Sequence, residues 1–377
     1  MPSTICKNSL QTLRCLLRVA ISLGFVAADA FMPMWDHDAN ASPVPVVYGT
    51  DLFHPYDDPD DHYDLATLFA LPDVEIRAIL LDLGDRQKER PGTIPLRQMF
   101  KITGRTVPYA TGLSAPLESE DDAALTRPRS ELAAVDLLLD VLRRSPTPVN
   151  IVTAGSLRDV AIAFNREPQL LRDKVAKLYI NIGSAIDRQE WNVGLDVHAY
   201  LAILRSGLPV YLCPCEPLAP HEHSTYWKFR QSEVFEGLSR PTLNWLIYGL
   251  QRVDPVRLAP DAVLTDDLSA WQELPGRLER NMWCTASLLD VAEKTAVLHN
   301  GRFIVGNKPA QEKGRLFEFI PARVEVDEQG RTKSIAMDPQ SKIHLFHTSK
   351  PHRYAEAMRD CLHELLKSLG REESRPE

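Results

Sequence analysis

The stretch that decides the fold runs from Val44 to Leu71 and reads VPVVYGTDLFHPYDDPDDHYDLATLFAL. Its apolar beginning predicts a β-strand, and its apolar end, from Leu65 onward, predicts one face of a helix. Between them, six aspartates lie within the fourteen residues from Asp51 to Asp64. Clustered carboxylates at the end of a strand can hold a hard cation, because calcium takes roughly six to eight oxygen ligands. The alternative interpretation is a solvated acidic loop that caps a helix.

Strand-like and helix-like segments alternate downstream of this stretch. Apolar runs at 74–83, 107–110, 149–153, 177–182 and 208–212 predict strands, and periodic runs at 59–71, 131–142, 157–164 and 198–204 predict helices. This alternation predicts an α/β fold with an open, mostly parallel, doubly wound sheet. In such a sheet the ligand lies beyond the carboxyl ends of the strands. Asp51, Gly84-Asp85, Ala154-Gly155 and Gly183 all follow predicted strands, so we expect them to converge.

The pattern changes after residue 300. Residues 317–326 and 334–337 flank a turn at 328–330 and predict a β-hairpin, and residues 354–369 predict an amphipathic helix. We therefore assign residues 45–300 to the main domain. Residues 301–377 form a small hairpin-and-helix appendage that we expect to pack on it.

The composition is that of a globular protein of 377 residues, with a formal net charge of −8 and a pI of about 5.8. This charge gives no reason to expect a nucleic-acid partner. At the N-terminus, basic residues precede a short apolar run, which predicts a signal peptide over residues 1–30 and a linker over residues 31–44. The chain is then exported to the periplasm or secreted; without a signal peptide it is cytoplasmic. The apolar run is too short to span a bilayer.

Three motifs follow one another along the chain. Asp51 and the pair Asp60-Asp61 follow the first predicted strand, TAGSLRDVA lies at 153–161, and QEWNVGLDVHAY lies at 189–200. In this order they resemble motifs of the inosine-uridine type of nucleoside hydrolase. The family opens with D-x-D-x-x-x-D-D, of which Asp51 matches the second aspartate and Asp60-Asp61 match the pair, and a T-G motif and an A-E-F-N motif follow. The resemblance covers roughly residues 45–290, and it implies the same α/β fold.

The resemblance also implies a calcium site, a ribose site and a reaction. The calcium ligands that it implies are Asp51, Asp61 and the backbone carbonyl of Ala154. The groups implied for the ribose hydroxyls are Asp60, Glu190 and Asn192. The implied reaction is calcium-dependent hydrolysis of the N-glycosidic bond of a ribonucleoside or related N-riboside, with Asp51 as the general base for a metal-activated water.

The chain departs from the family pattern at several positions. The three-residue gap before the aspartate pair becomes eight residues, and Gly49 replaces the first aspartate. Met282 and Trp283 stand where the family has the histidine and the metal-binding aspartate of a late H-D-P motif. Asp85 replaces an asparagine, and we still assign it to the substrate side. The segment LESEDDAALTRP at 117–128 has no counterpart of the family's histidine-rich purine-side loop.

These departures leave several questions open. Asp57 or Asp58 from the insertion, or Asp64 from the helix, could replace the missing metal ligand. Trp283 could stack on a base or sugar, or belong to the core, and His54 is a candidate leaving-group acid only through its position in the loop. The alternatives to a nucleoside hydrolase are a catalytically degenerate riboside- or sugar-binding protein and a hydrolase of a different glycoside. Relatives commonly form homo-oligomers, which leaves that state open here.

Overall fold

The computed structural model describes residues 42–370 apart from 251–263, 266–267, 269–272 and 309–314. The expected signal peptide and most of the expected linker lie outside the described residues. Residues 36–377 form one compact unit that contains both the main domain and the C-terminal segment.

A nine-stranded sheet forms the centre of this unit, in the order β12-β11-β13-β6-β5-β4-β1-β2-β3. Its strands are β1 (Val44–Thr50), β2 (Val74–Leu81), β3 (Tyr109–Thr111), β4 (Val149–Ala154), β5 (Val175–Ile180), β6 (Val210–Leu212), β11 (Glu318–Val326), β12 (Thr332–Met337) and β13 (Ile343–His347). All neighbouring pairs from β13 to β3 are parallel, whereas β11 pairs antiparallel with both β13 and β12. The predicted open, mostly parallel sheet is confirmed.

The order of the strands creates a switch point between β1 and β4. From β1 the chain proceeds outward through β2 and β3, and it then returns to build β4, β5 and β6 on the other side of β1. The loops that follow β1 and β4 therefore leave in opposite directions and open a crevice at the carboxyl edge of the sheet. Every residue of β4 is buried, as expected for a central parallel strand.

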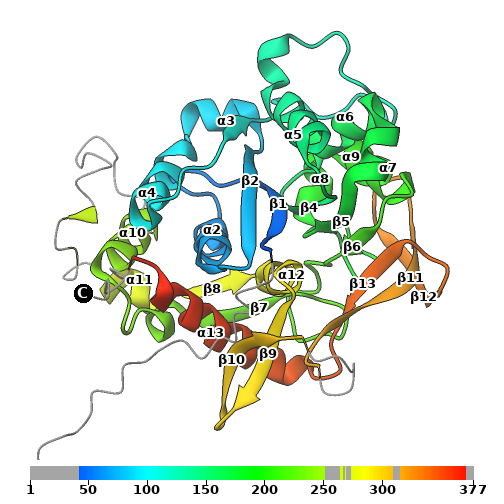
Figure 1. Ribbon diagram of the computed structural model, residues 1–377. Helices are drawn as coiled ribbons and strands as arrows, with labels where there is room; N and C mark the ends of the chain where they lie inside the picture. Colours follow the sequence, from blue (N-terminus) through cyan, green and yellow to red (C-terminus); the bar gives the residue numbers. More distant parts are fainter. Residues whose placement is uncertain (1–41, 251–263, 266–267, 269–272, 309–314, 371–377) are drawn as a thin grey trace, which may run out of the picture. The chain divides into compact units, whose positions relative to one another are not determined.

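Helices cover both faces of the sheet (Figure 1). One layer contains α5 (Ala133–Arg144), α6 (Arg158–Arg166), α7 (Pro168–Lys174), α8 (Trp191–Leu195) and α9 (Val197–Arg205). The other contains α2 (Asp60–Ala70), α4 (Thr93–Thr103), α10 (Arg240–Leu250), α12 (Thr285–Val291) and α13 (Pro351–Ser368). Helix α2 is at the centre of its layer, where it contacts α4, α12 and α13, so its first turn is firmly placed at the switch point.

The loops after β2 and β4 are tied together at the carboxyl edge. Leu83 and Leu157, one in each loop, have φ values of 60° and 63°, a left-handed conformation that is strained for leucine. The Asp82 carboxylate accepts hydrogen bonds from the Ser156 backbone N–H (2.6 Å) and from its hydroxyl (3.0 Å). A Cβ at Gly155 would lie 2.6 Å from Asp82 Oδ2, which explains the glycine in this motif.

The C-terminal hairpin and helix predicted from the sequence are present as β11, β12 and α13. Strand β13 pairs with β6, so the hairpin is attached to the central sheet through backbone hydrogen bonds. Two local features differ from expectation. Helix α2 begins at Asp60 rather than at Pro59, without a side-chain cap. Residues 224–286, whose amphipathic spacing predicts mostly helix, contain a short antiparallel pair of β7 (Trp227–Arg230) and β8 (Glu279–Met282).

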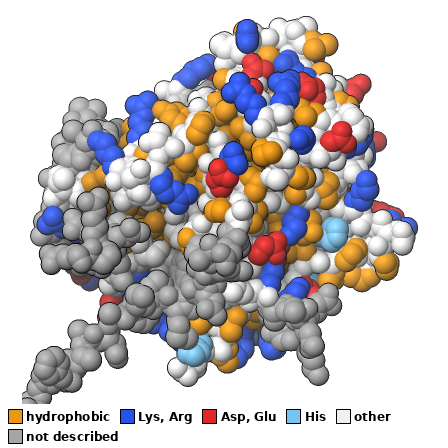
Figure 2. Space-filling view, viewed as in Figure 1, with side chains coloured by type: hydrophobic (Ala, Val, Ile, Leu, Met, Phe, Trp, Pro, Cys, Tyr) orange, Lys and Arg blue, Asp and Glu red, His pale blue; other side chains and the backbone are white. Residues whose placement is uncertain are grey.

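The remaining described elements are short. They are α3 (Gly84–Glu89), α11 (Glu273–Arg277), the hairpin of β9 (Lys294–His299) and β10 (Arg302–Asn307), and two 3-10 turns at 129–131 and 231–234. No helix in the described part of the chain has the length and apolar character needed to cross a membrane. On the face shown in Figure 2, acidic and basic side chains are mixed.

Candidate active site

A cavity of about 490 Å³ opens at the carboxyl edge of the sheet, at the switch point. Its lining residues come from the loops after β1, β4, β5 and β6, from the start of α2 and from the β8–α12 junction. They are Asp51, Asp57, Asp58, Asp60, Asp61, Arg86, Ala154, Asn181, Glu190, Trp191, Asn192, Cys215, Glu216, Leu218, Asn281, Trp283 and Cys284. Nine of the twelve residues singled out as site candidates from the sequence line this one cavity, and His54, Asp64 and Asp85 do not.

Asp51, Asp61 and Ala154 meet at the buried end of the cavity. The Asp51 backbone N–H donates to the Ala154 carbonyl oxygen at 3.1 Å, because Thr50 and Ala154 are partners in the parallel β1–β4 ladder. The carboxyl groups of Asp51 and Asp61 are within hydrogen-bonding reach of each other. The Thr50 hydroxyl donates to Asp61 Oδ1 and fixes the orientation of that carboxyl group. Two carboxyl groups and one carbonyl thus present hard oxygen donors together.

The buried carboxyl groups of this cluster resist ionisation. Burial, and then the charge of Asp82, raise the pKa of Asp51 to about 7. Burial and the charge of Asp51 raise the pKa of Asp61 well above its usual range, and burial and Asp58 do the same for Asp60. Among the described residues, no Lys or Arg side chain forms an ion pair with Asp51, Asp60 or Asp61. A bound cation would therefore favour the ionised form of these carboxyl groups.

None of the three carboxylates proposed to complete the metal site joins Asp51 and Asp61. Asp57 forms ion pairs with Arg86 and Arg90, and Asp58 faces Arg280 at 3.7 Å, although both line the cavity. Asp64 is fully buried one turn further along α2 and lies outside the cavity lining. In the described part of the chain, no three carboxylates of this cluster place one oxygen each within 4.8 Å of one another.

Glu190 and Asn192 form the opposite wall of the cavity. Glu190 caps α8: its carboxylate accepts from the backbone N–H groups of Asn192 (2.9 Å), Val193 (3.2 Å) and Gly183 (3.1 Å). These bonds hold a carboxylate that is only 6% exposed, and burial raises its pKa. Asn192 Oδ1 is buried and has no hydrogen-bond partner within the described residues. A substrate hydroxyl could satisfy this acceptor.

Two tryptophans flank the cavity opening. The Trp283 indole N–H donates to the Cys215 carbonyl at 2.8 Å, which fixes the ring against the cavity. Trp191, which the sequence interpretation missed, lines the cavity and is 69% exposed. An exposed indole beside a polar pocket is suited to stacking on a flat ring. The sequence left open whether Trp283 belongs to the site or to the core; its side chain is partly buried and lines the cavity.

The comparisons with known proteins agree with this geometry. The sequence profile of the inosine-uridine preferring nucleoside hydrolases matches residues 55–338. The chain belongs to this family. The match to a pyrimidine-specific ribonucleoside hydrolase of Citrobacter koseri is 27% identical over 190 residues, which are 45% of this chain but only 59% of that protein. The corresponding Shigella boydii enzyme is 25% identical and aligns over 52% of this chain and 67% of its own length.

The fold comparison extends further along the chain than the sequence comparisons. A plant nucleoside hydrolase superposes with a TM-score of 0.54 at 16% identity, and covers 85% of this chain and 99% of the plant protein. Because the identity is this low, the likeness concerns the fold. It agrees with the parallel sheet and switch point described above.

Asp85 does not occupy the position that the family's asparagine pattern suggested. It lies in the first turn of α3, its side chain is 70% exposed, and it pairs with Lys88 at 2.8 Å. The predicted place of Asp85 in the substrate site is therefore wrong. Leu83, two residues earlier, has a left-handed conformation and is the N-cap of α3; Arg86 of this helix lines the cavity, whereas Asp85 does not. Asp82, three residues earlier, is the buried acidic group of this loop, and it binds the β4 loop.

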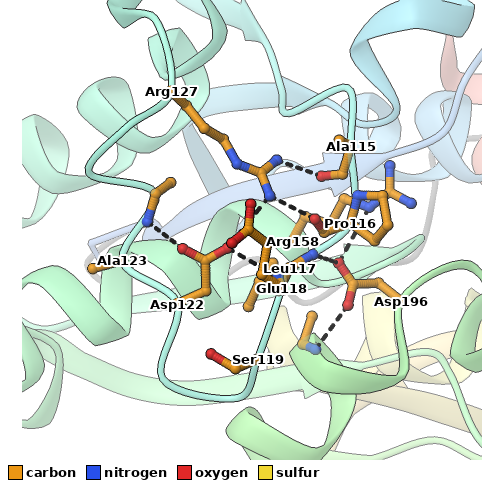
Figure 3. A network of polar contacts seen from close by, with 12 residues as sticks. Ala115, Pro116, Leu117, Glu118, Ser119, Asp122, Ala123, Arg127, Arg158 and Asp196 are labelled. Atoms are coloured by element: carbon orange, nitrogen blue, oxygen red, sulfur yellow. Dashed lines mark hydrogen bonds and ion pairs between the residues drawn. The ribbon is translucent and has the colours of Figure 1, made fainter.

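The loop of residues 112–128 contributes no residue to the lining of the cavity within the described chain. Figure 3 shows the polar contacts that hold this loop. Arg127 donates to the carbonyls of Ala115 and Pro116 and pairs with Asp122, while the Leu117 N–H donates to Asp196 Oδ2 at 2.8 Å. Asp196 itself caps α9 and pairs with Arg158 at 3.3 Å. Its role is therefore that of a helix N-cap and not of a ligand.

Two further positions correct or extend the prediction. His54 stacks on Tyr248 outside the cavity lining, and burial lowers its pKa to about 4, so it is a poor candidate for a leaving-group acid at neutral pH. Asn181 lines the cavity directly after β5, held by bonds to the Thr153 carbonyl and the Ser287 hydroxyl. Strand β5 ends at Ile180, two residues before the end of the strand predicted over 177–182. The sequence interpretation therefore placed Asn181 inside the strand and missed its position at the strand end.

Proposed function

We propose that the chain hydrolyses the N-glycosidic bond of a ribonucleoside or a related N-riboside. Family membership supports this reaction class, and a cavity with a carboxylate end, a polar wall and two indoles supports a sugar–base substrate. The observation that carries the proposal is the position of Asp51: a partly buried carboxyl group at a strand end, lining the cavity beside Asp61 and the Ala154 carbonyl. A carboxylate in this position is suited to act as the general base for a water bound in the cavity.

The donor groups at the buried end of the cavity are of the type that calcium prefers, but we assign only three of them to the ion. The Asp51 and Asp61 carboxylates and the Ala154 carbonyl are hard oxygen donors, and a carbonyl oxygen that already accepts one N–H retains a second lone pair. Calcium held there would supply the positive charge that these carboxylates lack and would acidify a bound water. Because Trp283 replaces a family aspartate and Asp58 faces Arg280, water and substrate hydroxyls must supply the other ligands.

The remaining groups have separate tasks in the proposed reaction. Asp51 takes the proton of the attacking water, whose oxygen bonds to the anomeric carbon as the C–N bond breaks. The base leaves with the electron pair of that bond and takes up a proton from solvent. Asp60, Glu190 and Asn192 bind the ribose hydroxyls, and the buried Asn192 Oδ1 is the acceptor still without a partner in the described chain. Positioning of this kind converts binding energy into rate. Trp191 and Trp283 stack on the leaving base.

The leading alternative is a riboside-binding protein without hydrolytic activity. The replaced aspartate and the absence of a third clustered carboxylate in the described residues favour it. A panel of purine, pyrimidine and nitrophenyl ribosides, assayed for released ribose with added calcium and with a chelator, separates the two. Ribose release that requires calcium supports the hydrolase. Ligand-induced stabilisation without release of ribose supports the binding protein. Sugar release from nitrophenyl glycosides other than ribosides, assayed in parallel, indicates a different hydrolase.

A further inference from the structure

A second group of metal-binding side chains lies outside the cavity that we assign to catalysis. Glu222 and His223 belong to the loop between β6 and β7, and His347 is the last residue of β13. One ligand atom from each of these three residues lies within 4.8 Å of the other two. In a tetrahedral zinc site two ligand atoms lie about 3.4 Å apart, since Zn–N and Zn–O bonds are about 2.0–2.2 Å long. Small side-chain rotations would therefore bring all three onto one ion.

His223 already has the orientation of a metal ligand. Its Nδ1 is 3.1 Å from the carbonyl oxygen of Phe346, and its Nε2 is 3.7 Å from Glu222 Oε1. If Nδ1 carries the proton and donates to that carbonyl, Nε2 keeps a free lone pair on the side of Glu222. Burial lowers the pKa of His223, which favours the neutral ring that a metal requires.

His347 supplies an independent observation. Its ring centroid is 5.2 Å from that of His223, and its Nδ1 is buried without a hydrogen-bond partner within the described residues. A buried ring nitrogen without a partner is costly unless a ligand satisfies it. The backbone between the two elements is already connected, because the Thr348 N–H donates to the Glu222 carbonyl at 2.8 Å. The two backbone segments that carry the histidines and the glutamate are thus joined before any ion binds.

We propose that Glu222, His223 and His347 bind a divalent transition-metal ion of the zinc type. Two imidazoles and one carboxylate are a donor set that zinc prefers and calcium does not. The ion would fasten the β6–β7 loop to the end of β13, with water in the fourth position. Since Glu216 and Leu218 of this loop line the large cavity, the metal would fix one wall of that cavity. The proposal does not depend on the hydrolase activity.

Zinc binding to the full chain tests this proposal, with calcium kept in excess so that the aspartate cluster does not compete. Isothermal titration should show one zinc ion per chain, and cobalt in its place should give a visible spectrum typical of nitrogen ligation. His223→Ala and His347→Ala should each weaken binding by at least about tenfold. Glu222→Gln should weaken it too, and this change is safe for folding because the Glu222 side chain is 59% exposed.

His352→Ala is the matched control, because this exposed histidine lies only five residues after His347. It should bind zinc as the original chain does, and zinc should raise the thermal unfolding temperature of both. Zinc binding that is undetectable in the original chain, or that is equally strong in Glu222→Gln and His347→Ala, would overturn the proposal.

Discussion

The backbone N–H of Asp51 donates to the carbonyl oxygen of Ala154 at 3.1 Å, across the last rung of the β1–β4 ladder. This one bond fixes the distance between the proposed general base and the proposed carbonyl ligand. Both positions are set by strand pairing and not by loop conformation, so their geometry is as rigid as the sheet. The catalytic end of the cavity is therefore built into the fold at its switch point.

Removal of the Asp51 carboxylate should abolish most of the activity without unfolding the protein. We expect Asp51→Asn to lower kcat/KM by roughly 10²–10⁴-fold, the range for loss of a general base. The calcium-free variant should unfold at a higher temperature than the original chain, because one of several mutually repelling buried carboxyl groups is gone. The matched control is Asp85→Asn, an identical chemical change at an exposed position, which should alter neither quantity.

Asn192 should affect substrate binding more than stability. Its buried Oδ1 has no partner in the described protein, so Asn192→Ala should leave the free energy of unfolding nearly unchanged. Loss of a hydrogen bond to a ribose hydroxyl should weaken substrate binding by about 1 kcal/mol, or several-fold in KM. Asn165→Ala should lower the free energy of unfolding and leave KM unchanged, since the Asn165 amide donates to the carbonyls of Glu120 and Asp122. Equal effects of the two substitutions on KM would contradict the role of Asn192.

Restoring the family aspartate at position 283 tests the composition of the metal site. Trp283→Asp adds a carboxylate to a proposed calcium site that has the carboxylates of Asp51 and Asp61 and the Ala154 carbonyl, so calcium should bind at least about tenfold more tightly. The KM should rise, because the stacking indole is lost. Trp283→Phe removes the bond to Cys215 but retains a ring, and should leave calcium affinity unchanged. Calcium titration of the three chains measures the difference; an unchanged affinity in Trp283→Asp would place the ion elsewhere.

His54 should contribute a loss of stability on mild acidification because it is buried in its neutral form, whereas the carboxyl groups with a raised pKa act in the opposite direction. Its pKa is about 6.5 in the unfolded chain and is lowered to about 4 in the folded chain. The unfolded state therefore binds the proton first, and the stability present above pH 6.5 is lost as the pH falls from about 6.5 to 4. At about pH 5 the loss amounts to about 2 kcal/mol.

Replacing His54 by phenylalanine should remove part of this pH dependence. The new ring can keep the stack on Tyr248, whose centroid lies 4.6 Å from that of His54. Urea unfolding at about pH 7.5 and about pH 5 measures the difference for both chains. His62, whose pKa burial also lowers, to about 3, should still contribute its share in the variant. An identical loss of stability in the two chains would show that His54 does not carry it.

The fold was largely predictable because its signals are local. Apolar runs, the aspartate pair at the start of α2 and the hairpin turn near Gly330 each depend on neighbouring residues only. The convergence of Asp51, Ala154 and Glu190 was also predictable, because strand ends of a parallel sheet meet at one edge. The membership of β13 in the same sheet was not predicted, since its partner β6 lies far away in the sequence.

The errors at the site arise from contacts that sequence spacing does not encode. Asp85 and Asp82 both follow β2, and only the left-handed Leu83 decides which of them points inward. Asp57 and Asp58 lie in the right loop, but arginines brought in from other segments, Arg90 and Arg280, neutralise or compete for them. Trp191 was missed because a lone exposed tryptophan has no periodicity to mark it.

The most direct test of the central claim is the initial rate of ribose release from the best riboside of the panel, measured against the concentration of free calcium. The account predicts a rate that rises with calcium to a plateau, falls to the background level in chelator, and is lost in Asp51→Asn at every calcium concentration. A rate that is independent of calcium, or that persists in Asp51→Asn, would contradict the assignment of Asp51 and its neighbours as the catalytic centre.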